Sequence, residues 1–91
     1  MQFVASDEFL RAFKKLNTKQ KKDARKALLL LGAEPMPKSL RFRRFQGREN
    51  TWIANINKGD RIILIEIEPD LYDLVDIGPH DATYRKWNRR K

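Results

Sequence analysis

The apolar residues in the first third of the chain recur at helical spacing. Phe9, Phe13 and Leu16 fall on one face of a helix, and Ser6 stands where an N-cap residue is expected. A second apolar stripe, within residues 19–31, predicts a longer helix directly after the first. Two short helices in succession predict an α-hairpin that lies on a sheet.

The strands are predicted from apolar runs that turn signals separate. Arg61 to Ile67 is almost continuously apolar, which is typical of a central strand covered on both faces. Gly59 lies in the turn before it and is available for a positive φ angle. Leu40 and Phe42 alternate with arginines, as in a strand with one basic, solvated face. The other strands are expected within residues 3–5, 38–45, 52–57 and 71–77.

A last short helix is expected after Pro79, which suits the first position of a helix because its missing N–H would have no partner there. Residues 88–91 then form a basic tail. The order is strand, two helices, an antiparallel meander and a terminal helix. It predicts one α+β domain over residues 1–91, with two layers: an N-terminal strand and α-hairpin packed on a mostly antiparallel sheet of four to five strands.

Charge narrows the choice of partner. Twenty Lys and Arg residues against twelve Asp and Glu give a net charge of +8 and a pI near 10.1. On so small a body this favours a polyanion or an acidic protein as partner, although a basic surface can also serve solubility alone. The densest cluster lies between Lys38 and Arg48, where Phe42 and Phe45 can either stack bases or face the core.

Several classes of function are excluded or disfavoured. There is no cysteine and only one histidine, so thiolate and multi-histidine metal sites are excluded, and no cofactor is expected. No stretch approaches the ~18 apolar residues of a membrane span. The first residues lack the pattern of a signal peptide, so the expected location is the cytoplasm.

The segment that ends the last strand carries the candidate chemistry. His80 and Tyr84 stand at i and i+4 on the predicted helix, and Trp87 adds a neighbour at i+7. An imidazole and a phenol on one turn are suited to proton chemistry on a phosphate-bearing ligand. The alternatives are structural: a hydrogen-bonding role for His80, and a core position for Tyr84 and Trp87.

Arg61 also has a structural alternative, an ion pair with Asp76 or Asp81.

With Arg61 after its turn, and Gly-Pro-His-Asp-x-x-Tyr after the last strand, the sequence resembles the RelE/ParE toxin superfamily. These are the toxins of bacterial type II toxin–antitoxin modules. The resemblance extends over essentially the whole chain, in size, charge and order of elements.

The resemblance implies an endoribonuclease that cuts mRNA, commonly on the ribosome, without a metal. The ribose 2′-hydroxyl attacks the adjacent phosphate and leaves a 2′,3′-cyclic phosphate and a 5′-hydroxyl. It also implies a cognate antitoxin with an acidic or amphipathic segment as partner.

By the same resemblance, the catalytic residues are Arg61, which stabilises the phosphate, His80, which transfers a proton, and Tyr84, which stacks on or orients the nucleotide. Some members use a lysine pair or a glutamate on the middle strands as base. This sequence has Asn55, Asn57 and Lys58 there, so the choice between base and acid for His80 stays open. The expected RNA-binding residues are Lys38, Arg41, Arg43, Arg44, Arg48, Lys58 and Arg85.

Two rival functions share this fold. The ParE branch inhibits DNA gyrase by binding and cuts no RNA; its members generally lack the histidine and aromatic residue after the last strand. A member without activity would keep the basic surface as a binding module for nucleic acid or an acidic protein.

Overall fold

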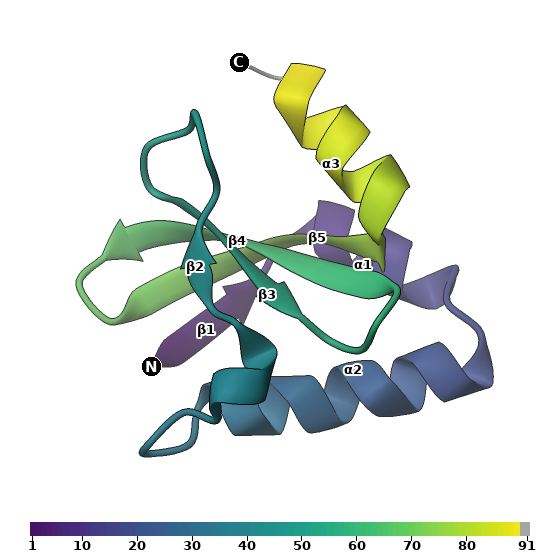
Figure 1. The fold of residues 1–91 in the computed structure, drawn as a ribbon, viewed down its shortest axis with the longest axis horizontal. Coiled ribbons are helices and arrows are strands. Elements are labelled where there is room, and N and C mark those ends of the chain that lie inside the picture. Colours follow the sequence, from purple (N-terminus) through teal and green to yellow (C-terminus); the bar gives the residue numbers. More distant parts are fainter. Residues whose placement is uncertain (90–91) are drawn as a thin grey trace.

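A computed structural model describes residues 1–89, without the side chain of Arg89. These residues form five strands, three α-helices and one 3-10 turn (Figure 1). The predicted basic tail starts inside the last helix, and its final two residues lie outside the described part. In order, the elements are β1 (Gln2–Ala5), α1 (Asp7–Lys14), α2 (Thr18–Leu31), the 3-10 turn (Lys38–Leu40), β2 (Arg43–Arg44), β3 (Thr51–Asn55), β4 (Asp60–Glu68), β5 (Leu71–Pro79) and α3 (His80–Arg89).

The strands form one mixed sheet in the order β1-β5-β4-β3-β2. Only the β1–β5 pair is parallel, because the α1–α2 hairpin follows β1 and returns the chain to the far edge of the sheet. The other three pairs are antiparallel. This confirms the predicted α+β class, with β4 in the middle of the sheet.

Each face of the sheet has its own core. Ile62 and Leu64 of β4 face α1 and α2, where they pack with Phe9, Ala24 and Leu31. Ile63, between them, faces the other way and packs with Trp87 of α3, as strand alternation requires. The helices therefore lie on opposite sides of the sheet (Figure 1), and the prediction that β4 is covered on both faces is confirmed.

Side-chain caps fix the first two helices. The hydroxyl oxygen of Ser6 accepts from the Phe9 N–H at 3.1 Å and donates to the Leu74 carbonyl at 2.9 Å, so the cap also ties α1 to β5. Asn17 and Gln20 form a capping box at the start of α2. The helix predicted to reach Leu16 ends at Lys14. None of the helices within residues 1–89 is long and apolar enough to cross a membrane.

The strand expected over residues 38–45 is largely wrong. A 3-10 turn occupies residues 38–40, Arg41 adopts the left-handed conformation at φ 45°, and only Arg43 and Arg44 pair with β3. Leu40 and Phe42 still pack into the core under α2, while Phe45 is buried on the α3 side. Phe42 and Phe45 are therefore core aromatics.

Two turn predictions also need correction. The turn before β4 needs no positive φ at Gly59, because the Asn57 side-chain oxygen accepts from the N–H groups of Gly59 and Asp60, both at 2.8 Å. Pro79 is the last residue of β5, and α3 begins one residue later, at His80.

Candidate active site

Four elements bring polar side chains together on the side of the sheet that α3 covers. Arg43 of β2 lies opposite Ile53 of β3, and Arg61 of β4 lies opposite Asn55, so all four positions share this face. α3 begins at the same end of the sheet (Figure 1). It adds His80, whose N–H donates to the Gly59 carbonyl, and Tyr84, whose hydroxyl contacts Arg43.

Arg43 links the strands to α3. Its Nη2 donates to the Tyr84 hydroxyl oxygen at 3.1 Å, and its Nη1 donates to Oδ1 of Asn55 at 3.1 Å and to the Arg41 carbonyl. Because a guanidinium can only donate, the Tyr84 oxygen accepts here and its own O–H proton is free to point elsewhere. The phenol is thus held by a cation.

Arg61 is the second guanidinium of the site. Its Nη1 donates to the carbonyl oxygens of Asn57 and Asp60, both at 2.9 Å, so backbone acceptors fix the direction of the side chain. Burial lowers the pKa of Arg61 and the nearby charge of Arg43 lowers it further, against smaller opposing effects of Tyr84 and Asp60. Within residues 1–89, Arg61 forms neither of the predicted ion pairs, with Asp76 or with Asp81.

The position of Arg61 favours an anionic ligand. Within residues 1–89, its Nε is buried and has no hydrogen-bond partner. The carboxylate of Asp60, the adjacent residue, accepts instead from Gln20 at 3.1 Å and from Asn57 at 3.0 Å. Two neighbouring cations whose hydrogen bonds go to neutral oxygens form a site that an anion, such as a phosphate, would stabilise.

His80 and Tyr84 form a pair of rings at the start of α3. Their centroids are 4.4 Å apart, with the planes tilted by 50°. Nδ1 of His80 lies 2.9 Å from Oδ1 of Asp81, and the imidazole side chain is 46% exposed. A carboxylate partner assigns the ring proton to Nδ1, so Nε2 of the neutral ring is left as the acceptor. Phe45 stacks on the Tyr84 ring at 5.4 Å.

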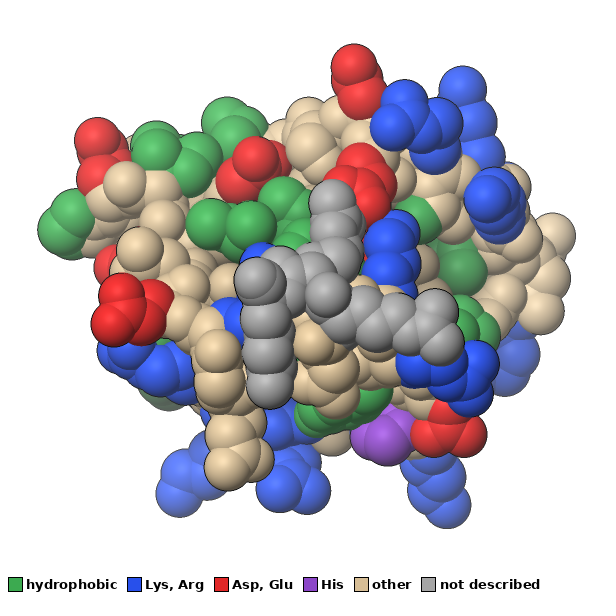
Figure 2. Space-filling view, turned by 90° about the horizontal axis from the view of Figure 1, so that it is seen from above, with side chains coloured by type: hydrophobic (Ala, Val, Ile, Leu, Met, Phe, Trp, Pro, Cys, Tyr) green, Lys and Arg blue, Asp and Glu red, His purple; other side chains and the backbone are tan. Residues whose placement is uncertain are grey.

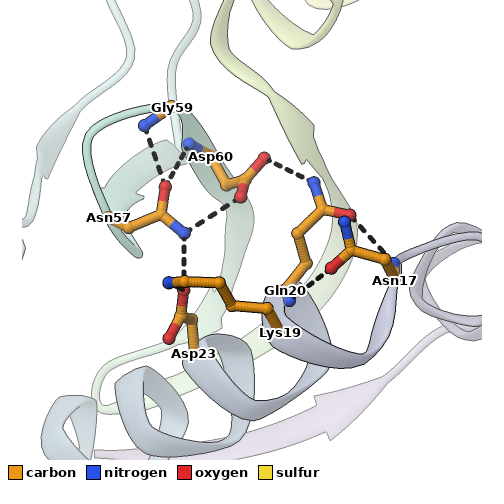
Figure 3. Close-up of polar contacts among 7 residues, drawn as sticks. All are labelled: Asn17, Lys19, Gln20, Asp23, Asn57, Gly59 and Asp60. Atoms are coloured by element: carbon orange, nitrogen blue, oxygen red, sulfur yellow. Dashed lines mark hydrogen bonds and ion pairs between the residues drawn. The ribbon is translucent and has the colours of Figure 1, made fainter.

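The loop between β3 and β4 ties the site to both helix layers, and Figure 3 shows its contact with α2. The Asn57 amide donates to the carboxylates of Asp23 and Asp60, both at 3.0 Å, which connects the loop to α2. On the other side, the His80 N–H donates to the Gly59 carbonyl at 2.7 Å. The start of α3 and the start of β4 are therefore held against the same short loop.

The remaining predicted RNA-binding residues do not form a single group. Arg48 packs over the Trp87 ring at 5.2 Å and donates to the Trp87 carbonyl at 3.3 Å, so it holds α3 in place. Arg44 lies over Trp52 at 5.0 Å, on the opposite face of the sheet from Arg43. Lys and Arg side chains gather along the same edge of the molecule as the histidine (Figure 2). The predicted cations that are exposed at the surface are Lys38, Arg41, Arg44, Lys58 and Arg85.

Two residues of the site were not recognised as such from the sequence. Arg43 was predicted only as a general RNA contact, and Asn55 only as a departure from the pattern on the middle strands. Their side chains meet because β2 pairs with β3 at a register that local alternation does not reveal. As for metals, residues 1–89 contain no cluster of three or more His, Asp or Glu side chains that could hold an ion.

Comparison with known proteins identifies the fold. No family model matches the sequence, and no curated protein matches it. Among solved structures, RelE in the RelB–RelE antitoxin–toxin complex of Methanococcus jannaschii is similar over 96% of this chain and 99% of its own, with a TM-score of 0.70 and 12% identity.

Two further toxins have the same arrangement. YafQ of the E. coli DinJ–YafQ toxin–antitoxin complex matches 91% of this chain and 96% of its own, with a TM-score of 0.66 and 16% identity. A YoeB/ParE toxin from Agrobacterium tumefaciens matches 88% of this chain and 99% of its own, with a TM-score of 0.64 and 9% identity. The RelE-like fold predicted from the sequence is therefore confirmed.

Proposed function

We propose that this chain is the toxin of a type II toxin–antitoxin pair and acts as a metal-independent endoribonuclease on mRNA. The observation that carries the proposal is the hydrogen bond from Arg43 to the Tyr84 hydroxyl, with the His80 ring beside it. Arg61 lies on the same face of the sheet as Arg43. The fold supports the toxin assignment, since its solved relatives are RelE, YafQ and YoeB/ParE toxins. These relatives include a YoeB/ParE toxin, and the ParE branch inhibits gyrase instead of cutting RNA, so the fold does not distinguish the two activities. The nuclease assignment therefore rests on the residues of the site.

The reaction that fits these groups is an internal transfer at phosphorus. The 2′-hydroxyl oxygen bonds to the adjacent phosphorus, and the bond from phosphorus to the 5′-oxygen breaks. One proton leaves the 2′-hydroxyl and one must reach the departing 5′-oxygen. The products are a 2′,3′-cyclic phosphate and a 5′-hydroxyl, and neither water nor an oxidant is consumed.

His80 is suited to take the proton from the 2′-hydroxyl. With Nδ1–H directed at Asp81, Nε2 is the basic atom of the neutral ring, and its exposure leaves room for a ribose. A histidine in this role contributes roughly 10²–10⁴-fold to the rate of a proton-transfer step. Asp81 acts as a positioning residue, because it sets the tautomer of the ring.

Arg61 and Arg43 are suited to the charge that builds up on the phosphorane. Both are fixed by hydrogen bonds before substrate arrives, so little reorganisation is needed in the transition state. The Tyr84 ring contacts both Phe45 and His80, which favours a role for its hydroxyl over stacking of the ring. The O–H that Arg43 leaves free is suited to give its proton to the departing 5′-oxygen, and the phenolate is reprotonated when His80 releases the proton that it took.

The basic surface supports RNA and an acidic antitoxin as the partners of this chain. The exposed cations Lys38, Arg41, Lys58 and Arg85 are suited to contact the backbone of mRNA and of ribosomal RNA, with Arg44 on the opposite face. An antitoxin with an acidic segment would neutralise the same positive charge. The substrate that fits the proposal is mRNA in the cytoplasm. RNA binding of this type weakens steeply as salt concentration rises.

The test compares the wild-type protein with Arg61→Ala, His80→Gln and Tyr84→Phe. Wild type is expected to arrest growth and to create new 5′ ends in translated messages, with 2′,3′-cyclic phosphate on the upstream fragments. Arg61→Ala and His80→Gln should cleave at least about 100-fold more slowly, while melting temperatures stay close to wild type.

Lys22→Ala is the matched control, because Lys22 is an exposed cation on α2 and is not one of the residues assigned to the site. Growth arrest without new 5′ ends, unchanged in all of these variants, would refute the nuclease and indicate a target such as gyrase that is inhibited by binding.

A further inference from the structure

A cleft lies beside the candidate active site, between α2, the 3-10 turn and the loop from β3 to β4. Its volume is about 470 Å³, within the roughly 300–1,000 Å³ typical of sites for small ligands. Its walls come from three parts of the chain that are far apart in sequence. The lining residues are Lys19, Asp23, Lys26, Ala27, Leu30, Ser39, Leu40, Asn55, Ile56, Asn57 and Lys58.

The lining divides into an apolar part and a polar, basic part. Leu30 and Ile56, beside the buried Leu40, offer a surface against which a flat, weakly polar ring can pack. Around it stand three lysines and one aspartate, Asp23, whose carboxylate already accepts from Lys19 at 3.2 Å and from Asn57 at 3.0 Å. The polar part is therefore positive overall and favours an anion.

The cleft and the active site share two residues, one in β3 and one in the loop that follows it. Asn55 lines it, and Oδ1 of the same residue accepts from the Arg43 guanidinium at 3.1 Å. Asn57 also lines it, and the carbonyl of Asn57 accepts from Arg61 at 2.9 Å. The two sites therefore meet at the end of β3, where the cleft lies on the α2 side of the sheet and the active site on the α3 side.

The rim is fixed before any ligand binds. The Asn57 side chain makes four hydrogen bonds, to Asp23, Asp60 and the N–H groups of Gly59 and Asp60 (Figure 3). A rigid rim lowers the ordering cost that binding would otherwise incur.

We infer that this cleft binds the nucleotide next to the scissile phosphate of a single-stranded RNA, with its base on the apolar part and its phosphate at Lys26 and Lys58. The inference rests on the proposed function. It commits to a path for the RNA that leaves the active site toward α2, away from α3.

The test measures binding of a fluorescein-labelled single-stranded RNA of about 12 nucleotides and mixed sequence, a length within the site sizes of single-strand binders. All of its 2′-oxygens are methylated, so that it cannot be cleaved. Ser39→Trp fills the cleft from an exposed position, and Lys26→Ala removes one cation from its rim. Lys22→Ala is the matched control, because it removes an exposed cation from the same helix outside the cleft.

We expect Ser39→Trp to weaken binding at least about fivefold, the loss of one stacked base, and Lys26→Ala about threefold. Lys26→Ala should also reduce the salt dependence, by about 0.7 in the slope of log K against log salt concentration, whereas Lys22→Ala should bind like wild type. If Ser39→Trp and Lys26→Ala bind like Lys22→Ala while Arg61→Ala binds weakly, the cleft is refuted and the proposed function stands. If wild type fails to bind at about 100 μM, both are refuted.

Discussion

The contact that holds α3 on the sheet gives the sharpest test of the structure. Trp87 is buried, and its indole N–H donates to the buried carboxylate of Asp76 at 2.7 Å. The same carboxylate accepts from the Ile77 N–H at 2.9 Å and lies 3.4 Å from Lys86. Trp87→Phe keeps a ring in the core but removes one of the hydrogen bonds that compensate a buried charge.

The expected loss is about 2 kcal/mol of unfolding free energy, because hydrogen bonds to charged groups contribute roughly 1.5–3 kcal/mol. A domain of this size has a total stability of about 5–14 kcal/mol, so the loss is a large fraction of it. With a urea m-value near 2 kcal/mol/M, the midpoint of unfolding should fall by about 1 M.

Trp52→Phe is a matched control within the same chain. Trp52 also has an arginine over its ring, Arg44 at 5.0 Å against 5.2 Å for Arg48 over Trp87. Its N–H, however, lies 3.4 Å from a Glu66 oxygen, near the limit of a hydrogen bond. Urea unfolding followed by circular dichroism should therefore give Trp52→Phe a shift of less than half that of Trp87→Phe. Equal shifts for the two variants would refute the assignment of stability to the Trp87–Asp76 bond.

Three further outcomes follow from single contacts. A hydrogen bond from Asn57 lowers the pKa of Asp23 below 3.8. The stabilisation that the Asp23 carboxylate contributes is therefore present above pH 3.8 and is lost as the pH falls through the lowered pKa. Urea midpoints measured from about pH 6 to about pH 2.5 should fall less steeply in Asn57→Ala than in wild type. The hydrogen bond to Glu8 raises the pKa of Lys86 above 10.5. The stabilisation from Lys86 is therefore complete below pH 10.5 and is lost as the pH rises through the raised pKa. Lys86→Met should abolish this loss of stability when the same titration is carried to alkaline pH. Gly47→Ala should cost about 1–2 kcal/mol because Gly47 has φ 86°, whereas Gly78→Ala adds a methyl group in ordinary contact at 3.5 Å and should leave the melting temperature almost unchanged; equal costs would contradict this reading of the backbone.

The sequence predicts the elements whose own periodicity decides their structure. The apolar run that became β4 and the helical spacing of residues 7–14 and 18–31 each identify an element without reference to the rest of the chain. The strand predicted over residues 38–45 is largely wrong because the alternation of apolar and basic residues there has another cause. Leu40 and Phe42 point into one core and Phe45 into the other, since the chain passes around the edge of the sheet there.

The candidate site is only half visible in the sequence for a related reason. His80 and Tyr84 lie one helical turn apart, so local spacing places them together. The contact of Arg43 with Tyr84 joins residues 41 positions apart and depends on the strand order. A pattern of three or four residues carries no information on which strand forms the edge.

The position of β2 has a further consequence, for solubility. Edge strands expose unpaired backbone groups on which a second chain can add, and natural sheets limit this with short strands and charged residues. β2 is two residues long, and both are arginines. Arg43, which the proposed reaction uses, thus also protects the sheet edge against self-association. Arg43→Ala should remove both roles, whereas Arg43→Lys keeps the charge at the edge and changes the contact with Tyr84.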